Sequence, residues 1–219
     1  MATLAGVYLH IDMELSENEK SEAKHYLEQL TKDFLCRLYH QDINLSIEIR
    51  DGSVKIWLSV AGAIYLTIGQ YGSFRAGIDQ LIKDSHTVKS FITSTLLKGG
   101  LSQSLLLEEK RLITTPEKAR KILSKIERAQ TMLHTMNSEQ VQKELSIIYK
   151  SVDKLFIELS SHEDQKLFID AVPSEIQKKL FPYHNEPPYK YINDSYFAHI
   201  RRRNYRWESP FQKNRLELE

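Results

Sequence analysis

The sequence predicts an α+β fold, in which a small antiparallel sheet (β-α-β-β) carries a helix on one face and is followed by a mostly helical C-terminal region. Apolar and polar residues alternate near the N-terminus and again between residues 45 and 68, and this period of two is typical of strands. A helical pattern separates the two regions. After residue 72, apolar residues recur at spacings of three and four, which indicates helices only.

The first strand is expected over residues 7–15, where apolar residues occupy the odd positions. Ser16 and Glu19 follow in the capping-box pattern, in which each side chain bonds the other residue's backbone N–H at the start of a helix. Apolar residues at helical spacing continue this helix to about Tyr39. The odd-numbered residues of the strand should therefore face the helix. They are Val7, Leu9, Ile11, Met13 and Leu15.

A β-hairpin is expected next. Its first strand covers residues 45–50, and Asp51-Gly52 is a strong turn signal, because both central positions of a tight hairpin turn need positive φ. The second strand continues to about residue 68, with its even residues inward and Gly62 marking a bulge or bend. Three small residues, Ala61-Gly62-Ala63, would let a partner pack closely on the other face of this strand.

Membrane insertion is the alternative for residues 56–74, which contain no charged residue. A membrane span needs about 20 predominantly apolar residues. Glycine, serine, threonine and glutamine dilute this stretch, and its alternation of two unlike faces favours the hairpin. A membrane is therefore not the expected partner, and a membrane-active effector that inserts residues 56–74 is kept as the second alternative function.

The spacing of Gly72 and Gly77 is that of a phosphate-binding loop between a strand and a helix. However, Ile78 and Asp79 stand where such a loop has Lys and Ser or Thr, and an aspartate there would repel a phosphate. The favoured interpretation is that the glycines let the chain turn and pack a helix against the sheet. The sequence predicts no cofactor and no metal.

The rest of the chain is expected to be helical up to its tail. A long helix should end at Gly99-Gly100, which is a typical helix terminus and the clearest boundary in the chain. Thr115 is the expected N-cap of the next helix, with Pro116 in its first turn, and Ser138 is the expected cap of the third. The expected helices cover residues 74–98, 115–136, 138–159, 163–171 and 174–180. The expected divisions are a β-α-β-β-α module at 1–100, a helical region at 101–181 and a Pro/Tyr/Arg-rich tail at 182–219.

One candidate for catalysis or metal binding lies on the first strand. His10, Asp12 and Glu14 should project from one face, because side chains two residues apart lie on the same side of a strand. A histidine and two carboxylates in that arrangement can bind a metal or transfer protons. Cross-strand ion pairs with Glu48, Arg50 and Lys55 on a solvated face explain the same residues equally well.

A second candidate is the pair Arg128 and His134, with the spacing R-x5-H on a helix. This spacing resembles the arginine–histidine signature of HEPN ribonucleases, which are helical. The resemblance implies that these two side chains act on the 2′-hydroxyl and the cleaved phosphate of RNA. That family usually has a polar residue after the arginine, where this sequence has Ala129. The alternative is an ordinary surface arginine and a histidine near a helix end.

The third candidate is the tail, where arginines alternate with aromatic residues. The favoured interpretation of such a tail is a protein interface, because these are common hot-spot residues, and the alternative is phosphate contacts with base stacking. A solvated or internally paired tail is the remaining interpretation. The candidate partner-binding or nucleic-acid-binding residues are Arg201, Arg202, Arg203, Tyr205, Arg206 and Trp207.

Composition narrows the class of protein. The chain has 219 residues, of which 41% are hydrophobic and 27% charged, as in ordinary globular proteins. A formal net charge of +1 gives no overall field that favours nucleic acid or membrane. The single cysteine, Cys36, cannot form an internal disulfide, and the N-terminus lacks the basic start of a signal peptide. These observations predict a cytoplasmic protein.

Three segments resemble a motif of small bacterial proteins that occur in multi-gene systems, including phage-defence loci. The segments are Asp51-Gly-Ser-Val-Lys55, Ala61-Gly-Ala63 and Tyr71-Gly-Ser-Phe-Arg75 with Gly77-Ile-Asp79. The resemblance implies a component of a larger assembly and assigns no residue a role. The favoured function is a non-enzymatic interaction or assembly subunit that binds another protein or itself. The alternative is an RNA- or DNA-binding effector, or a HEPN-like ribonuclease that uses the tail and Arg128 with His134.

Overall fold

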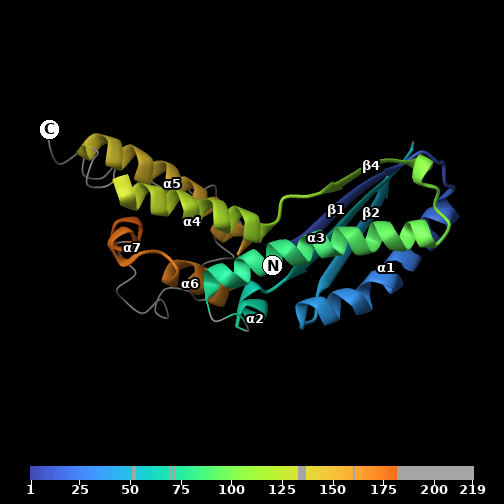
Figure 1. The fold of residues 1–219 in the computed structure, drawn as a ribbon, viewed down its shortest axis with the longest axis horizontal. Helices are drawn as coiled ribbons and strands as arrows, with labels where there is room; N and C mark the ends of the chain where they lie inside the picture. Colours follow the sequence, from blue (N-terminus) through green and yellow to red (C-terminus); the bar gives the residue numbers. More distant parts are fainter. Residues whose placement is uncertain (51–52, 70, 72, 133–136, 160, 182–219) are drawn as a thin grey trace, which may run out of the picture. The chain divides into compact units, whose positions relative to one another are not determined.

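The computed structural model describes residues 1–50, 53–69, 71, 73–132, 137–159 and 161–181 (Figure 1). Met1–Leu180 forms one unit and Phe181–Glu219 a second. Several predictions fall outside the described residues: the turn at Asp51-Gly52, Gly72 and His134. The tail residues Arg201, Arg202, Arg203, Tyr205, Arg206 and Trp207 also lie outside them.

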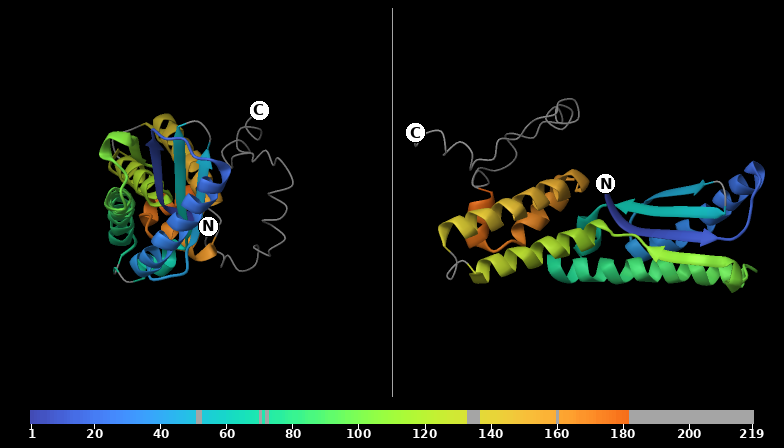
Figure 2. Two further views of the ribbon diagram at one scale, coloured as in Figure 1. Left: turned by 90° about the vertical axis from the view of Figure 1, so that its right-hand side faces the viewer. Right: turned by 90° about the horizontal axis from the view of Figure 1, so that it is seen from above.

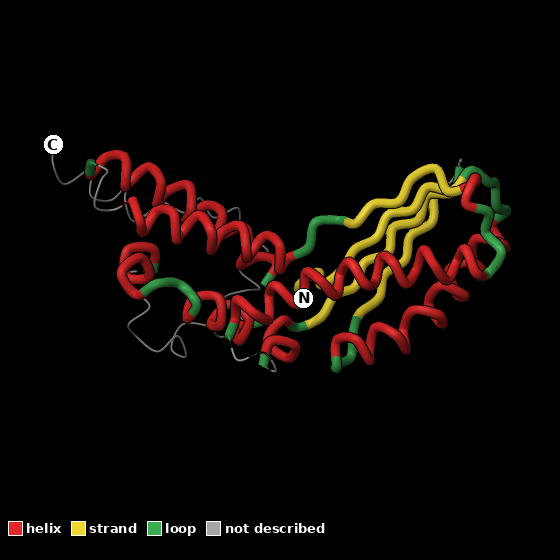
Figure 3. The backbone as a smooth tube through the Cα atoms, viewed as in Figure 1, coloured by secondary structure: helices red, strands yellow, loops and turns green. Residues whose placement is uncertain are grey.

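Four strands form one antiparallel sheet with the order β2-β3-β1-β4 (Figure 3). The expected hairpin is confirmed as β2 and β3, which pair from Asn44↔Ala61 to Arg50↔Lys55. With this strand order, the element sequence β-α-β-β-α-β is the split β-α-β arrangement of ferredoxin-like folds. The strands are β1 (Ala2–Ile11), β2 (Asn44–Arg50), β3 (Val54–Gly62) and β4 (Leu106–Arg111).

Two long helices cover one face of the sheet, and the predicted α+β class is confirmed. They are α1 (Glu17–Tyr39) and α3 (Phe74–Lys98), which lie on the same side of the strands (Figures 1 and 2). Ser16 and Glu19 form the predicted capping box, and Phe34 of α1 stacks on Phe91 of α3 with ring centroids 3.9 Å apart. The apolar sheet residues beneath these helices are buried. They are Val7, Leu9, Ile11, Ile47, Val54, Ile56, Leu58 and Val60.

The prediction of helices alone after residue 72 is wrong, because β4 completes the sheet. Its residues pair with β1 from Val7↔Arg111 to Ile11↔Leu106. The segment has no continuous apolar stripe, since Glu109 and Arg111 follow Leu106 opposite the inward-facing residues of β1. Instead of burying apolar surface, Glu109 forms an ion pair with Lys89 of α3 at 2.9 Å. A short 3-10 helix, η1 (Gln103–Leu105), precedes β4.

The expected bounds of two strands are also wrong. The first strand, expected over residues 7–15, is β1 at Ala2–Ile11, so Met13 and Leu15 lie beyond its end, and Met13 is 37% exposed. The second hairpin strand was expected to continue to residue 68. Strand β3 ends at Gly62, and a short helix, α2 (Ile64–Ile68), follows. Gln41 explains the stop, because its side chain donates to the carbonyl of Ala63 at 2.9 Å and accepts from the N–H of Ala63 at 3.0 Å. These bonds occupy the backbone groups that a continued strand would use.

Four helices make up the C-terminal part of the first unit, as predicted. They are α4 (Thr115–Met132), α5 (Ser138–Glu158), α6 (His162–Asp170) and α7 (Ser174–Leu180). The cap of α5 is Asn137 rather than Ser138, since Asn137 and Gln140 form a capping box. Likewise Thr115 is the first residue of α4 rather than its N-cap. No helix in the described part of the chain is long and apolar enough to cross a membrane.

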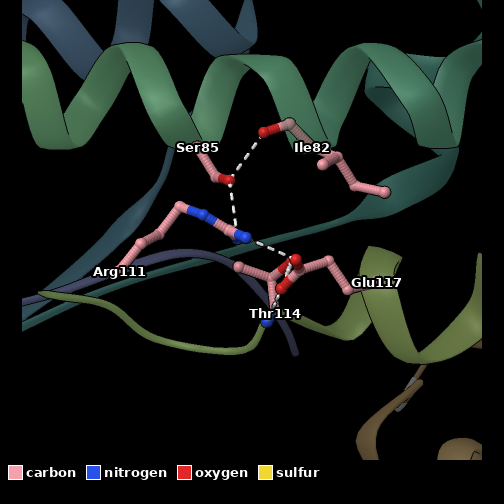
Figure 4. A network of polar contacts seen from close by, with 5 residues as sticks. All are labelled: Ile82, Ser85, Arg111, Thr114 and Glu117. Carbon is pink, nitrogen blue, oxygen red and sulfur yellow. Dashed lines mark hydrogen bonds and ion pairs between the residues drawn. The ribbon is translucent and has the colours of Figure 1, made fainter.

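A polar network joins the start of α4 to the sheet and to α3 (Figure 4). Arg111, at the end of β4, donates to the Ser85 hydroxyl at 3.2 Å and to the Glu117 carboxylate at 2.5 Å. The other carboxylate oxygen of Glu117 accepts from the backbone N–H of Thr114 at 2.9 Å. The Arg111 guanidinium holds the pKa of Glu117 below its usual range. This network ties the helical part to the rigid sheet module.

Candidate functional site

The second face of the sheet carries a group of aromatic and charged side chains. Because paired residues of neighbouring strands point to the same side, the registers place them in two adjacent rows. One row is Glu48, Trp57, Tyr8 and Lys110, and the next is Arg50, Lys55, His10 and Glu108. These eight residues, all partly or fully exposed, are called the open sheet face.

Tyr8 and Trp57 form the centre of the first row. Their ring centroids lie 5.0 Å apart with the ring planes at 49°. The guanidinium carbon of Arg50 lies 4.6 Å from the centroid of the Trp57 ring, so Arg50 makes a cation–π contact with one ring face. Both aromatic residues lie on the central strands, which are paired on both sides, so their backbone positions are set by the sheet.

Charges of both signs surround the two rings. Glu48 pairs with Arg50 and Glu108 with Lys110, each at 2.5 Å. The hydrogen bonds to these carboxylates raise the pKa of Arg50 and of Lys110. Both pairs are solvent-exposed, and such pairs contribute little to stability. Three cations (Arg50, Lys55, Lys110) against two carboxylates leave the open sheet face at +1 with His10 neutral.

The strand that was expected to carry His10, Asp12 and Glu14 on one face does not extend to the two carboxylates. Strand β1 ends at Ile11, so the alternation that predicted a shared face stops before Asp12 and Glu14, which are exposed. Instead, His10 Nε2 lies 2.5 Å from the hydroxyl of Ser53, at the start of the hairpin's second strand. The strand register confirms the prediction that His10 lies on the same sheet face as Arg50 and Lys55. Among the residues that the structure describes, no group of three His, Cys, Asp or Glu side chains could hold a metal ion.

Arg128 lies exposed on α4, and its carbonyl accepts a hydrogen bond from the Thr131 hydroxyl at 2.8 Å. Since α4 is described only to Met132, the pairing of Arg128 with His134 stays a prediction.

The small residues at the end of β3 serve packing within the chain. A Cβ on Gly62 would lie 2.7 Å from Leu4 Cδ1, so a side chain there would collide with β1. The backbone N–H and carbonyl of Ala63 are both hydrogen-bonded to the Gln41 side chain. The expected close approach of a partner at Ala61-Gly62-Ala63 therefore has an internal explanation for two of the three residues.

Sequence reasoning missed Tyr8 and Trp57 as a pair. In the sequence, each of the two residues occupies a position that alternates with the buried residues of its strand. This alternation indicated that both side chains face outward. Only the strand order and register bring the two rings together. No family model, curated protein or solved structure matches this chain. The element sequence and strand order are those of the ferredoxin-like arrangement, here with aromatic and charged side chains on one sheet face. An arrangement of this kind does not by itself imply a function.

Proposed function

We propose that the chain is a non-enzymatic binding subunit of a bacterial multi-protein system, and that the open sheet face is its contact surface. The sequence resemblance to components of multi-gene systems, phage defence included, suggests the setting. The observation that carries the proposal is the pair Tyr8 and Trp57, held 5.0 Å apart on the two central strands with both rings partly exposed.

The physical argument is one of preorganisation. Tyrosine, tryptophan and arginine are the residue types that contribute most at binding surfaces, because they offer a large contact area together with a polar group. Here the Trp57 ring already contacts both the Tyr8 ring and the Arg50 guanidinium in the free chain. A ligand that docks on them orders few additional side chains, so little conformational entropy is lost on binding.

Site-specific photo-cross-linking in the native host tests this proposal. The photoreactive residue p-benzoylphenylalanine replaces Lys55 on the open sheet face or, as a matched control, Lys24, which is exposed on α1. We expect cross-linked adducts from position 55 and far fewer from position 24. Equal yields at the two positions, or no adduct at position 55, would contradict the assignment of the surface.

A further inference from the structure

We infer that the open sheet face binds single-stranded nucleic acid, with bases stacked on Tyr8 and Trp57 and phosphates beside Arg50, Lys55 and Lys110. This inference rests on the proposed function and names the partner of the same surface. It follows from three features: the ring pair, the polar surroundings of the rings and the placement of the cations.

The ring pair is suited to stacking because of what lies next to it. Beside Trp57 on the open face, the following row is formed by Ser59 and Ser46, which pair with each other across β3 and β2. Serine side chains are much shorter than an aromatic ring, so they leave room on that side of the partly exposed Trp57 for a planar base. Stacking on aromatic rings is tolerant of sequence because every base has a π face.

The surroundings of the rings favour nucleic acid over a protein partner. The core of a stable protein interface is depleted of charged residues and contains a continuous apolar area. Here Glu48, Arg50, Lys55 and Lys110 border the two rings, and Ser46 and Ser59 follow on β2 and β3. The third residue of that row is Gly6 of β1, beside which the Leu112 side chain lies. Apart from the rings and Leu112, the side chains in these rows are polar. A ligand that combines flat aromatic groups with charged groups is a better match.

The cations are placed where a phosphate backbone can reach them. Lys55 lies in the row beside the aromatic pair, with Arg50 and His10 as its direct cross-strand neighbours. Lys110 is the direct neighbour of Tyr8 on the other edge of the sheet. The carboxylates of Glu48 and Glu108 are each already paired with a cation of the same strand. The face therefore presents an excess of positive charge to an anionic ligand.

Fluorescence anisotropy with the full chain tests the inference. The probes are labelled oligouridylate and oligothymidylate of about 12 nucleotides, which fits the usual site sizes for single strands. A labelled duplex of the same length is the comparison. We expect the single strands to bind more tightly than the duplex, and Tyr8→Ala and Trp57→Ala each to weaken binding by roughly 5- to 150-fold.

Two further variants separate stacking from other effects. Trp57→Phe keeps a ring and should lose much less affinity than Trp57→Ala. Tyr26→Ala removes an aromatic side chain that is 48% exposed on α1, away from the open sheet face, and should leave binding unchanged. Circular dichroism verifies that each variant is folded. If the alanine variants unfold, the Lys55→Gln variant tests the inference instead. The loss of one phosphate contact to a single strand should reduce the slope of log K against log salt concentration by about 0.7.

The tail requires its own control, because its arginines suit phosphates as well. The variant with glutamine at Arg201, Arg202, Arg203 and Arg206 should still bind, and Trp57→Ala should weaken it further. Binding that is lost only with the tail arginines, or the absence of binding by any single strand, would overturn the inference. A protein adduct at position 55 without nucleic-acid binding would refute the inference and leave the proposed function standing. No adduct and no binding would refute both.

Discussion

Asp164 of α6 accepts a hydrogen bond at 2.6 Å from the backbone N–H of Tyr65, a residue 99 positions earlier in the chain. Asp164 is 1% exposed. Tyr65 lies in the first turn of α2, whose N-cap Ala63 makes no side-chain cap hydrogen bond. A remote carboxylate therefore serves as the cap of this short helix and fixes it to the helical part of the unit.

Replacing Asp164 with alanine should lower the free energy of unfolding by about 1–3 kcal/mol, because the backbone N–H of Tyr65 loses its buried acceptor. Urea unfolding followed by circular dichroism measures the change. Glu163→Ala is the control, since the exposed neighbouring carboxylate makes no such bonds, and its effect should stay within about 0.5 kcal/mol. Equal effects of the two substitutions would show that the cap contributes nothing.

Replacing Asp84 with asparagine should stabilise the protein at neutral pH. Asp84 is 5% exposed on α3, and burial raises the pKa of its carboxyl. The native state therefore holds the proton more tightly than the unfolded state, and the stability of the unsubstituted protein falls as the pH rises through the raised pKa. Asparagine keeps the acceptor for Gln80, which donates to Asp84 at 2.8 Å, and carries no charge.

The difference between the Asp84→Asn variant and the unsubstituted protein should shrink toward zero below the ordinary aspartate pKa of about 4. Unfolding curves at acid and neutral pH measure it. A stabilisation that does not change with pH would mean that ionisation of Asp84 is not its cause.

Glu117→Gln should have the opposite dependence on pH. The pKa of Glu117 is lowered, first by its hydrogen bond to Arg111, so its stabilising effect is full above the unfolded-state pKa of about 4.3. It is lost as the pH falls through the lowered pKa. At neutral pH we expect a cost of about 1–3 kcal/mol, because the bond between two largely buried charged groups is weakened.

The control for Glu117→Gln is Arg120→Gln. Arg120 pairs with Asp79 at 3.1 Å, but both side chains are well exposed. Its substitution should change stability by less than about 1 kcal/mol. Thermal unfolding of the two variants is measured from neutral to acid pH. If Glu117→Gln still destabilised the protein at low pH, the ionised Glu117 carboxylate would not be the source of the stabilisation.

Gly77→Ala should destabilise the contact between α3 and α2. A Cβ at Gly77 would lie 2.5 Å from Ile68 Cγ1, which is too close for a non-bonded contact between two carbon atoms. Relief of this overlap requires α2 to shift, at a cost of about 1–3 kcal/mol. Gly69→Ala is the matched control, because a Cβ there would lie 3.6 Å from the nearest atom, the Tyr65 carbonyl oxygen.

The Gly77→Ala effect should be smaller in a chain that also carries Ile68→Ala, since the colliding methylene is then absent. Unfolding of the four members of this double-mutant cycle measures the coupling. Additive effects of the two substitutions would show that the collision with Ile68 is not the cause.

Much of the fold was predictable because its determinants are local. The alternation at Val7, Leu9 and Ile11 indicates a strand whatever its place in the sheet. The capping box of Ser16 and Glu19 begins a helix through hydrogen bonds between residues three positions apart. The helix end at Gly99-Gly100 is equally local, since Gly100 adopts a φ of 106°. Short-range patterns of this kind do not depend on the rest of the structure.

The fourth strand and the candidate surface were decided by tertiary structure. Leu106–Arg111 has four charged residues among six, and it becomes a strand because β1 offers an edge and α3 offers partners to Glu109 and Arg111. His10 was expected beside Asp12 and Glu14, but the end of β1 at Ile11 separates them.

By itself, the sequence determined which residues of β1 up to Ile11 and of the hairpin β2–β3 face inward, and where α1 and α3 begin, because period and capping are properties of neighbouring residues. Only the tertiary structure decided that Tyr8 and Trp57 meet, with Arg50 over the tryptophan ring. The reason is that strand order and register depend on long-range hydrogen bonds between β1, β2 and β3, and no pattern within one strand specifies its neighbour's register.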